Sequence, residues 1–248
     1  MTSTLSNAGI RGILLDIEGT TTPIAFVHEV LFSYARSRIR NYLTEHSGSE
    51  ELLADLAELR QEHAADLKAG QQPPAIPDEA RDTEIDSIVA YINWLMDRDR
   101  KSKGLKSLQG KIWKQGYLDG ILKAQLFADV APALERWRAE GLNVSIFSSG
   151  SSLAQKLLFA HTDAGDLTRF ISNYFDTTVG SKTDVESYRQ IAAALSLPAE
   201  KVLFISDVIG ELDAASEAGM QTLLCVRPGN HPQAFPAPYR TIQTFDEV

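Results

Sequence analysis

The chain has few of the features that would assign it to several other protein classes. Its single cysteine, Cys225, lies in the apolar run TLLCV, which excludes a disulfide framework and a cysteine-based zinc site. No apolar run approaches the ~18 residues of a membrane span, and the first residues, MTSTLSNAG, lack the regions of a signal peptide. We therefore expect a cytoplasmic protein with no membrane partner.

The chain has fewer basic than acidic residues. The chain has 24 lysines and arginines against 33 aspartates and glutamates, and its formal net charge is −9. This balance argues against nucleic acid as a partner. It does not exclude a small anionic substrate, because a bound cation reverses the local field. The 248 residues suffice for one large domain or for a core with an inserted second domain, and without an exposed coiled-coil pattern we expect a monomer.

Four short apolar runs predict the buried strands of a parallel sheet. They lie at 12–16 (GILLD), 143–149 (NVSIFSS), 201–207 (KVLFISD) and 221–226 (QTLLCV). Each run is apolar on both faces, as is typical of strands that are covered by helices on both sides. Helical patterns at 150–161, 184–196 and 210–219 separate the later runs. This alternation predicts an α/β fold with a doubly wound parallel sheet.

The segment between the first two runs breaks the alternation. Residues 24–126 hold amphipathic helical segments near 26–35, 50–66, 83–99 and 108–124, with a proline-rich break at 70–80. A connection of about 100 residues is far longer than an ordinary loop. We therefore predict a core at 1–23, an all-helical cap at 24–126 and further core at 127–248. A cap that begins beside the first strand end is placed to act as a lid.

Residues with catalytic potential gather where the predicted strands end. These residues are Asp16, Glu18, Ser148, Ser149, Gly150 and Asp207, together with Lys182 ahead of the helix that begins TDVE (183–186). The TDVE start has the form of a capping box. If the strands are parallel, their ends meet at one edge, where open α/β sheets bind ligands.

The carboxylates in this set suit phosphoryl chemistry. Oxygen ligands from Asp16, Glu18 and Asp207 form a fitting shell for Mg²⁺. Asp16 would attack phosphorus as a nucleophile and form an aspartyl-phosphate. Glu18, two residues on, points to the same side of an extended chain, so it would protonate the leaving oxygen and later activate water.

The remaining residues suit the binding of a phosphate group. Ser148 offers a hydroxyl, and the amides of Ser149 and Gly150 open a helix, where an anion is favoured. Lys182 supplies positive charge for the phosphoryl oxygens. Glu211 has two interpretations, as a support for the metal ligands or as an acid that serves its helix dipole, and both remain open.

Four motifs in order resemble those of the haloacid dehalogenase-like (HAD) phosphatases. They are the run ILLDIEGT (13–20), the strand-end Ser148, Lys182 and the strand-end SD (206–207). Most HAD phosphatases carry Asp where this chain has Glu18. The longer stretches LLDIEGTTTPI, FSSGSSLAQKLLF, YFDTTVGSKTD and FISDVIGELDAASEAGM resemble, more narrowly, the enolase-phosphatase family of methionine salvage, the acireductone synthases.

This resemblance implies a HAD-like core with a cap, one Mg²⁺ per chain and the substrate 2,3-diketo-5-methylthiopentyl-1-phosphate. An enzyme of that family first enolises the substrate and then hydrolyses the phosphate ester. The residues that match the family's Mg²⁺ ligands are Asp16, Glu18 and Asp207, and those that match its substrate ligands are Ser148, Ser149 and Lys182.

Two details remain open within the resemblance. HAD relatives usually bind the metal through the backbone carbonyl of the second acid, so Glu18 could use either its carbonyl or its carboxylate. The base for enolisation is either Glu18 or a residue of the inserted helices, where residues 101–117 are rich in polar and basic groups and include Trp113 and Tyr117.

Three other functions compete with this one. A HAD phosphatase that acts on another small phosphate ester would share every phosphate motif. A phospho-receiver signalling domain is about half this length, has no such insertion and accepts the phosphoryl group on a middle strand. A haloacid dehalogenase proper needs no metal, which would leave Glu18 and Asp207 without a role.

Overall fold

The chain folds into two compact units. A computed structural model describes residue 5 and residues 9–76, 81–98, 100–232 and 238–248. The sheet unit comprises Met1–Glu29 and Leu122–Val248, and the helical unit comprises Val30–Ile121. These limits fall inside the predicted insertion of 24–126, because the segments just before and after the helical unit belong with the sheet unit. For example, the Ala124 amide donates to the His161 carbonyl at 2.9 Å. Residues 77–80 of the predicted proline-rich break lie outside the described residues.

The sheet has six parallel strands in the order β3-β2-β1-β4-β5-β6. The strands are β1 (Gly12–Leu15), β2 (Asn143–Phe147), β3 (Asn173–Phe175), β4 (Val202–Ser206), β5 (Gln221–Cys225) and β6 (Thr241–Ile242). All residues of β1 and β4 are buried, which agrees with their apolar sequences. The four predicted strands are therefore present, and β3 and β6 extend the sheet at its two edges.

Strand β1 lies at the centre of the sheet. Leu15 pairs with Ile146 of β2 on one side and with Ile205 of β4 on the other. The Asp16 amide donates to the Ile205 carbonyl at 3.0 Å, so the backbone continues alongside β4 for one residue beyond the strand. Because the strands are parallel, the ends of β1, β2 and β4 meet at one edge of the sheet.

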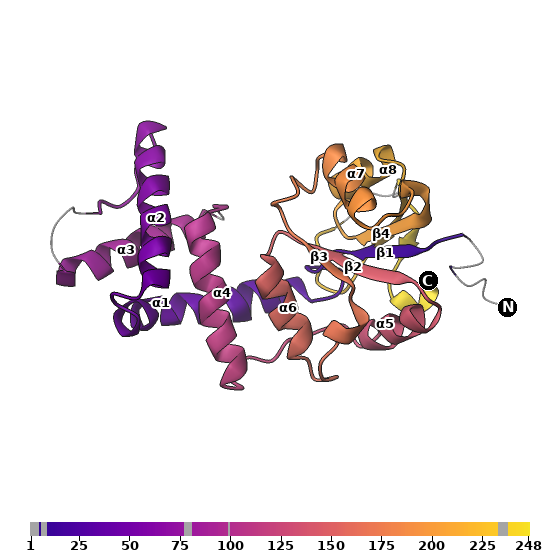
Figure 1. Cartoon of the computed structure of the whole chain (residues 1–248), viewed down its shortest axis with the longest axis horizontal. Helices are drawn as coiled ribbons and strands as arrows, with labels where there is room; N and C mark the ends of the chain where they lie inside the picture. The colour runs from indigo at the N-terminus through magenta and orange to yellow at the C-terminus, as the bar shows by residue number, and fades with distance from the viewer. Residues whose placement is uncertain (1–4, 6–8, 77–80, 99, 233–237) are drawn as a thin grey trace. The chain divides into compact units, whose positions relative to one another are not determined.

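Helices cover both faces of the sheet. They are α5 (Val130–Ala139), α6 (Ser152–Ala160), α7 (Val185–Ala194) and α8 (Ile209–Glu217). Helices α7 and α8 pack on one face, where Tyr188 and Leu212 join Leu14 and Phe204 in one buried cluster. Helices α5 and α6 lie on the opposite side (Figure 1). This arrangement confirms the predicted doubly wound α/β fold.

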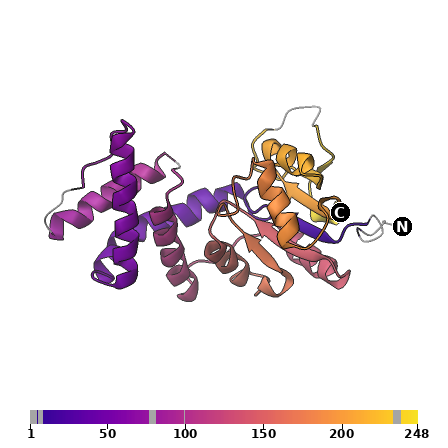
Figure 2. The same cartoon turned by 45° about the horizontal axis from the view of Figure 1, so that its top comes forward.

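Helices and connecting turns make up the described part of the helical unit, coloured indigo to magenta in Figure 2. The helices are α1 (Ser33–Glu45), α2 (Glu50–Lys68), α3 (Arg81–Met96) and α4 (Lys103–Leu118), and the π-helical stretch η1 (Phe26–Phe32) precedes them. Ion pairs join these helices, as between Lys111 of α4 and Asp55 of α2 at 2.6 Å. In the part of the chain that the structure describes, no helix combines the length and apolar character of a membrane span.

Candidate active site

The centre of the candidate site is an ion pair between Asp16, which the sequence placed at a strand end, and Lys182, which it placed ahead of a helix. The Lys182 ammonium lies 2.5 Å from Oδ1 of Asp16, and both side chains are less than a tenth exposed. Lys182 reaches this position from the loop between β3 and α7, where its carbonyl accepts a hydrogen bond from the Tyr188 hydroxyl at 2.7 Å. The structure thus brings the predicted nucleophile and the predicted phosphate-binding cation together.

The start of α7, which follows Lys182, differs from the predicted capping box. Helix α7 begins at Val185, and its N-cap is Asp184, whose side chain accepts from the Glu186 amide at 2.9 Å. The prediction had assigned the cap to Thr183. Asp184 is the N-cap instead of Thr183, because its carboxylate accepts a hydrogen bond from a free amide of the first turn and its negative charge interacts favourably with the positive end of the helix dipole.

Glu211 is the third member of the charged cluster. Its Oε2 lies 2.6 Å from the Lys182 ammonium and accepts a hydrogen bond from the Ser206 hydroxyl at 2.9 Å. Ser206 in turn accepts the Val208 amide at 3.1 Å, and its hydroxyl lies 3.5 Å from Oδ2 of Asp16. Glu211 lies in the first turn of α8, where its charge suits the helix dipole, and its side chain is buried and paired with Lys182. Its position therefore agrees with both interpretations.

Burial and mutual repulsion shift the pKa values in this cluster. The pKa of Asp207 is raised to about 7, chiefly by burial and then by the negative charges of Asp16 and Glu211. Burial and the Asp16 charge likewise raise the pKa of Glu211, although Lys182 opposes them. Burial alone would lower the pKa of Lys182, but the two carboxylates outweigh it, so that pKa is raised and the ammonium stays charged.

A tight turn follows Asp16. The amides of Thr20, Thr21 and Thr22 all donate to the Ile17 carbonyl at 3.2, 2.9 and 2.9 Å. Gly19 adopts a φ of +71°, and a Cβ at this position would overlap Oδ2 of Asp207. The glycine is thus required both by the backbone conformation and by the close approach of the turn to Asp207.

Ser148 is buried at the end of β2, and its hydroxyl accepts the Gly150 amide at 3.2 Å. The prediction that Ser149 and Gly150 open the next helix is wrong by two residues, because α6 begins at Ser152 with Ser151 as its N-cap. Gln155 holds the loop from inside, since its Nε2 donates at 2.8 Å to the carbonyls of both Gly150 and Phe175.

The Glu18 side chain has a different environment from Asp16. Its Oε1 lies 2.7 Å from Nε2 of His28, and the two side chains are 42% and 52% exposed. Among the described residues, no group of three or more His, Cys, Asp or Glu side chains is placed to hold a metal ion. The assignment of Asp16, Glu18 and Asp207 as metal ligands therefore stays a prediction.

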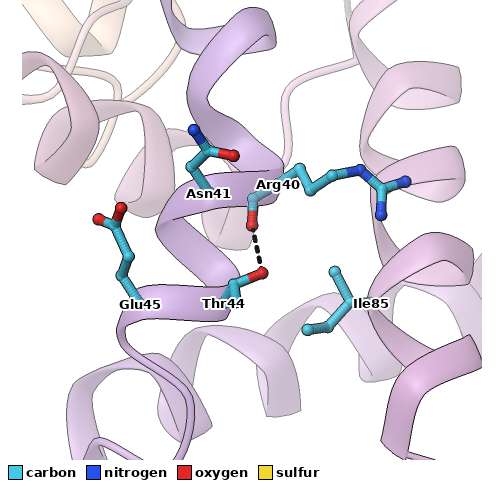
Figure 3. Close-up of a pocket in the computed structure, with 5 residues that line it drawn as sticks. All are labelled: Arg40, Asn41, Thr44, Glu45 and Ile85. Atoms are coloured by element: carbon cyan, nitrogen blue, oxygen red, sulfur yellow. Dashed lines mark hydrogen bonds between the residues drawn. The ribbon is translucent and has the colours of Figure 1, made fainter.

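The aromatic residues that the sequence singled out in α4 have structural contacts within the helical unit. The indole of Trp113 donates to the Leu31 carbonyl at 2.8 Å, and burial raises the pKa of Tyr117. The same unit has a surface pocket of about 500 Å³ (Figure 3), lined by Arg40, Asn41, Thr44, Glu45 and Ile85. None of the predicted site residues lines this pocket.

Comparisons with known proteins identify the family of this chain. Residues 10–219 match the haloacid dehalogenase-like hydrolase family. A Synechococcus elongatus protein named enolase-phosphatase E1 is 52% identical over 96% of this chain and 98% of its own length. The chain belongs to the enolase-phosphatase E1 family of HAD-like hydrolases.

Two further proteins similar to this chain are a longer plant protein and a yeast protein of known structure. An Arabidopsis thaliana protein named probable bifunctional methylthioribulose-1-phosphate dehydratase/enolase-phosphatase E1 is 43% identical, and the match covers 96% of this chain but 48% of the plant protein. A crystal structure of the UTR4 protein from Saccharomyces cerevisiae superposes with a TM-score of 0.78 at 33% identity, covering 96% of this chain and all of that one.

The donor types at this edge of the sheet suit the divalent cation that the family implies, although the described side chains do not converge as a ready ligand group. Three carboxyl groups, those of Asp16, Asp207 and Glu211, are buried in this part of the sheet unit, and the Lys182 ammonium forms ion pairs with two of them, Asp16 and Glu211. Burial first, and then the negative charges of Asp16 and Glu211, raise the pKa of Asp207, so a bound cation would favour its ionised form. Oxygen ligands in an electronegative pocket are the chemistry that Mg²⁺ favours.

Two contacts of the candidate site were not predicted from the sequence. They are the contact of His28 with Glu18 and the hydrogen bond that the Ser206 hydroxyl donates to Glu211. Ser206 carried a signal, because it is a polar residue within an otherwise apolar strand. His28 carried none, because its position ten residues after Glu18 has no regular spacing.

Proposed function

We propose that this chain is a Mg²⁺-dependent enolase-phosphatase of methionine salvage. It converts 2,3-diketo-5-methylthiopentyl-1-phosphate into 1,2-dihydroxy-3-keto-5-methylthiopentene and phosphate. The observation that carries the proposal is the buried Asp16–Lys182 pair at the end of β1, in a chain 52% identical to a protein named enolase-phosphatase E1. In this proposal the enzyme acts as a cytoplasmic monomer.

The phosphatase step uses Asp16 as the nucleophile. An Asp16 carboxylate oxygen forms a bond to phosphorus, and the bond between phosphorus and the substrate oxygen breaks. Glu18 donates a proton to that leaving oxygen, so the alcohol departs neutral. Water then attacks the aspartyl-phosphate, Glu18 takes the proton from the water, and the bond between phosphorus and Asp16 breaks to release phosphate.

Positive charge and hydrogen-bond donors hold the phosphoryl group during these steps. The Lys182 ammonium, already 2.5 Å from Asp16, supports the negative oxygens around phosphorus. Ser148, buried at the end of β2, supplies a hydroxyl, and Ser149 supplies a backbone amide. The Gly150 amide, which donates to the Ser148 hydroxyl at 3.2 Å, would turn to the phosphoryl group when substrate binds. Asp16, Asp207 and Glu18, the last through its carbonyl or its side chain, would hold one Mg²⁺, which neutralises charge on the phosphoryl oxygens when bound.

The enolisation step requires a base that removes a proton from the carbon next to a carbonyl group. Glu18 is the candidate from the sheet unit, since its carboxylate is accessible and is oriented by His28 at 2.7 Å. A residue of the inserted helices, where residues 101–117 are rich in polar and basic groups, is the alternative.

A substrate panel tests the proposed reaction. Phosphate release is measured with Mg²⁺ for the diketone phosphate and for other small phosphate esters of similar size. We expect kcat/KM for the diketone phosphate to exceed the others by at least about 100-fold, which corresponds to about 2.7 kcal/mol of transition-state discrimination. A better turnover of another ester would leave the phosphatase chemistry in place and contradict the substrate.

A further inference from the structure

The turn after Asp16 is held from outside by three donors. Nδ2 of Asn230 donates to the Gly19 carbonyl at 2.9 Å, and Nε of Arg227 donates to the Thr20 carbonyl at 3.1 Å. The Phe127 amide donates to the next carbonyl, that of Thr21, at 3.1 Å. Three consecutive carbonyls of the turn are thus bound by the later part of the chain, so a shift of the turn breaks several hydrogen bonds at once.

Arg227 is itself fixed on every side. Its guanidinium forms a two-bonded fork with Asp129, with Nη1 at 2.9 Å and Nη2 at 2.8 Å from the two carboxylate oxygens. The rings of Phe127 and Phe245 lie 4.6 and 4.7 Å from its central carbon. The side chain is 2% exposed. A planar guanidinium in this setting has one orientation, and its Nε then points at the Thr20 carbonyl.

The same ion pair binds the C-terminal segment. Nη1 of Arg227 donates to the Gln243 carbonyl at 2.8 Å, and the Phe245 amide donates to Asp129 at 2.6 Å. This segment, drawn in yellow in Figure 1, lies against α5. Arg227 therefore joins the nucleophile turn, the start of α5 and the C-terminal segment through one side chain.

We infer that Arg227 and Asn230 are positioning residues for the reaction at Asp16. They contact no reacting atom; they fix the backbone of the turn that carries Asp16 and Glu18. Nucleophilic attack depends on alignment, and a misplacement of about 1 Å can lower a rate by about 100-fold. The inference rests on the proposed function for its kinetic consequence, whereas the restraint on the turn can be measured without any substrate.

Two substitutions remove the contacts separately. Asn230→Ala removes the donor to Gly19 and leaves the Arg227–Asp129 pair intact. Arg227→Lys keeps the positive charge but lacks the fork, so it cannot bind Asp129 through two bonds and Thr20 at the same time. The matched control is Arg136→Met: Arg136 binds the carbonyls of Phe245 and Val248 at 2.7 and 3.2 Å, so this change loosens the same C-terminal segment without touching the turn.

The experiment measures kcat and KM of phosphate release together with hydrogen–deuterium exchange of the peptide 16–23. We expect Asn230→Ala and Arg227→Lys to lower kcat at least tenfold, to change KM less than threefold and to raise exchange in this peptide at least threefold. Arg136→Met keeps kcat and exchange within twofold of the wild type. Circular dichroism checks that each variant is folded. If Arg227→Lys does not fold, the result for Asn230→Ala alone decides the inference.

Two outcomes overturn the inference. A folded Asn230→Ala variant with wild-type kcat and wild-type exchange shows that the turn does not need these donors. An equal loss of kcat in Arg136→Met shows that general loosening of the C-terminal segment is responsible. If the wild type releases no phosphate from the diketone phosphate, the proposed function fails, and the exchange measurement still decides the positioning role.

Discussion

Lys182 and Asp16 are 166 residues apart in the sequence, and their side chains form a buried ion pair of 2.5 Å. Glu211 binds the same ammonium at 2.6 Å, so one cation serves two carboxylates. Buried charges are costly unless they are paired, and this arrangement persists because each charge has a partner. It keeps the Asp16 carboxylate beside a cation that a phosphoryl group can share during the reaction.

Lys182→Met should damage both stability and activity. Removal of the ammonium leaves Asp16 and Glu211 buried without their cation, so we expect the free energy of unfolding to fall by about 3–5 kcal/mol at pH 7. The loss should be smaller at pH 5, because the pKa of Glu211 is raised by burial and its carboxyl group takes up a proton there. Urea denaturation at the two pH values measures this. An equal loss at both would contradict a role for unpaired charge.

Gly19→Ala should lower activity by more than its backbone strain explains. The positive φ alone costs about 1 kcal/mol, and the new Cβ would also displace Asp207. Gly48→Ala is the control, because Gly48 has a φ of +85° and no atom within 4 Å of the added Cβ. We expect similar strain costs in both variants but a loss of kcat, at least tenfold, only in Gly19→Ala. Equal kcat values would show that contact with Asp207 is unimportant.

The metal-free protein should lose stability as the pH rises from about 4 to about 7. The pKa of Asp207 is raised in the folded state to about 7 from 3.8, so the native state binds a proton that the unfolded state releases in this window. The free energy of unfolding therefore falls with rising pH, and Glu211 acts in the same direction.

Asp207→Asn tests this origin of the pH dependence. The variant has no proton to exchange at this position, so its stability should fall less steeply over the same pH range in the presence of a chelator. Mg²⁺ should stabilise the wild type more at pH 8 than at pH 6, because protons compete with the cation. A wild type and a variant with parallel pH curves would assign the titration to other groups.

Glu18→Gln should separate proton transfer from metal binding. The Glu18 side chain is bound to His28 and is 42% exposed, so we expect its backbone carbonyl to be the metal donor. The variant should then keep the Mg²⁺ dissociation constant within threefold, measured by calorimetry, while kcat for phosphate release falls by about 100- to 1,000-fold. A large loss of Mg²⁺ affinity would instead identify the carboxylate as a ligand.

The fold followed from the sequence where a strand is a continuous apolar run. The runs that became β1, β2, β4 and β5 are apolar on both faces, and this continuity together with the helical patterns between the later runs identified them. Strands β3 and β6 were missed because three and two residues are too few to show a pattern. Helix α5 was missed as well, and its sequence contains Pro132 within the first turn, where proline is tolerated.

The sequence predicted which residues lie at the ends of neighbouring strands, and therefore which of them lie at the same edge of the sheet. Asp16, Ser148 and Asp207 follow parallel strands, so their convergence follows from topology. The sequence could not show that Glu211 reaches back to Lys182, or that Arg227 and Asn230 hold the turn after Asp16. These contacts depend on side-chain directions in three dimensions, and the residues are separated from their partners by 29 to more than 200 positions.

The most direct test follows the diketone phosphate with purified protein and Mg²⁺. Phosphate release and the ultraviolet absorbance of the enol products are recorded together for the wild type and for Asp16→Asn. We predict both signals from the wild type and at least a 1,000-fold slower phosphate release from the variant, whose remaining enol signal would separate the two steps. Phosphate release by Asp16→Asn at a rate near that of the wild type would contradict Asp16 as the nucleophile.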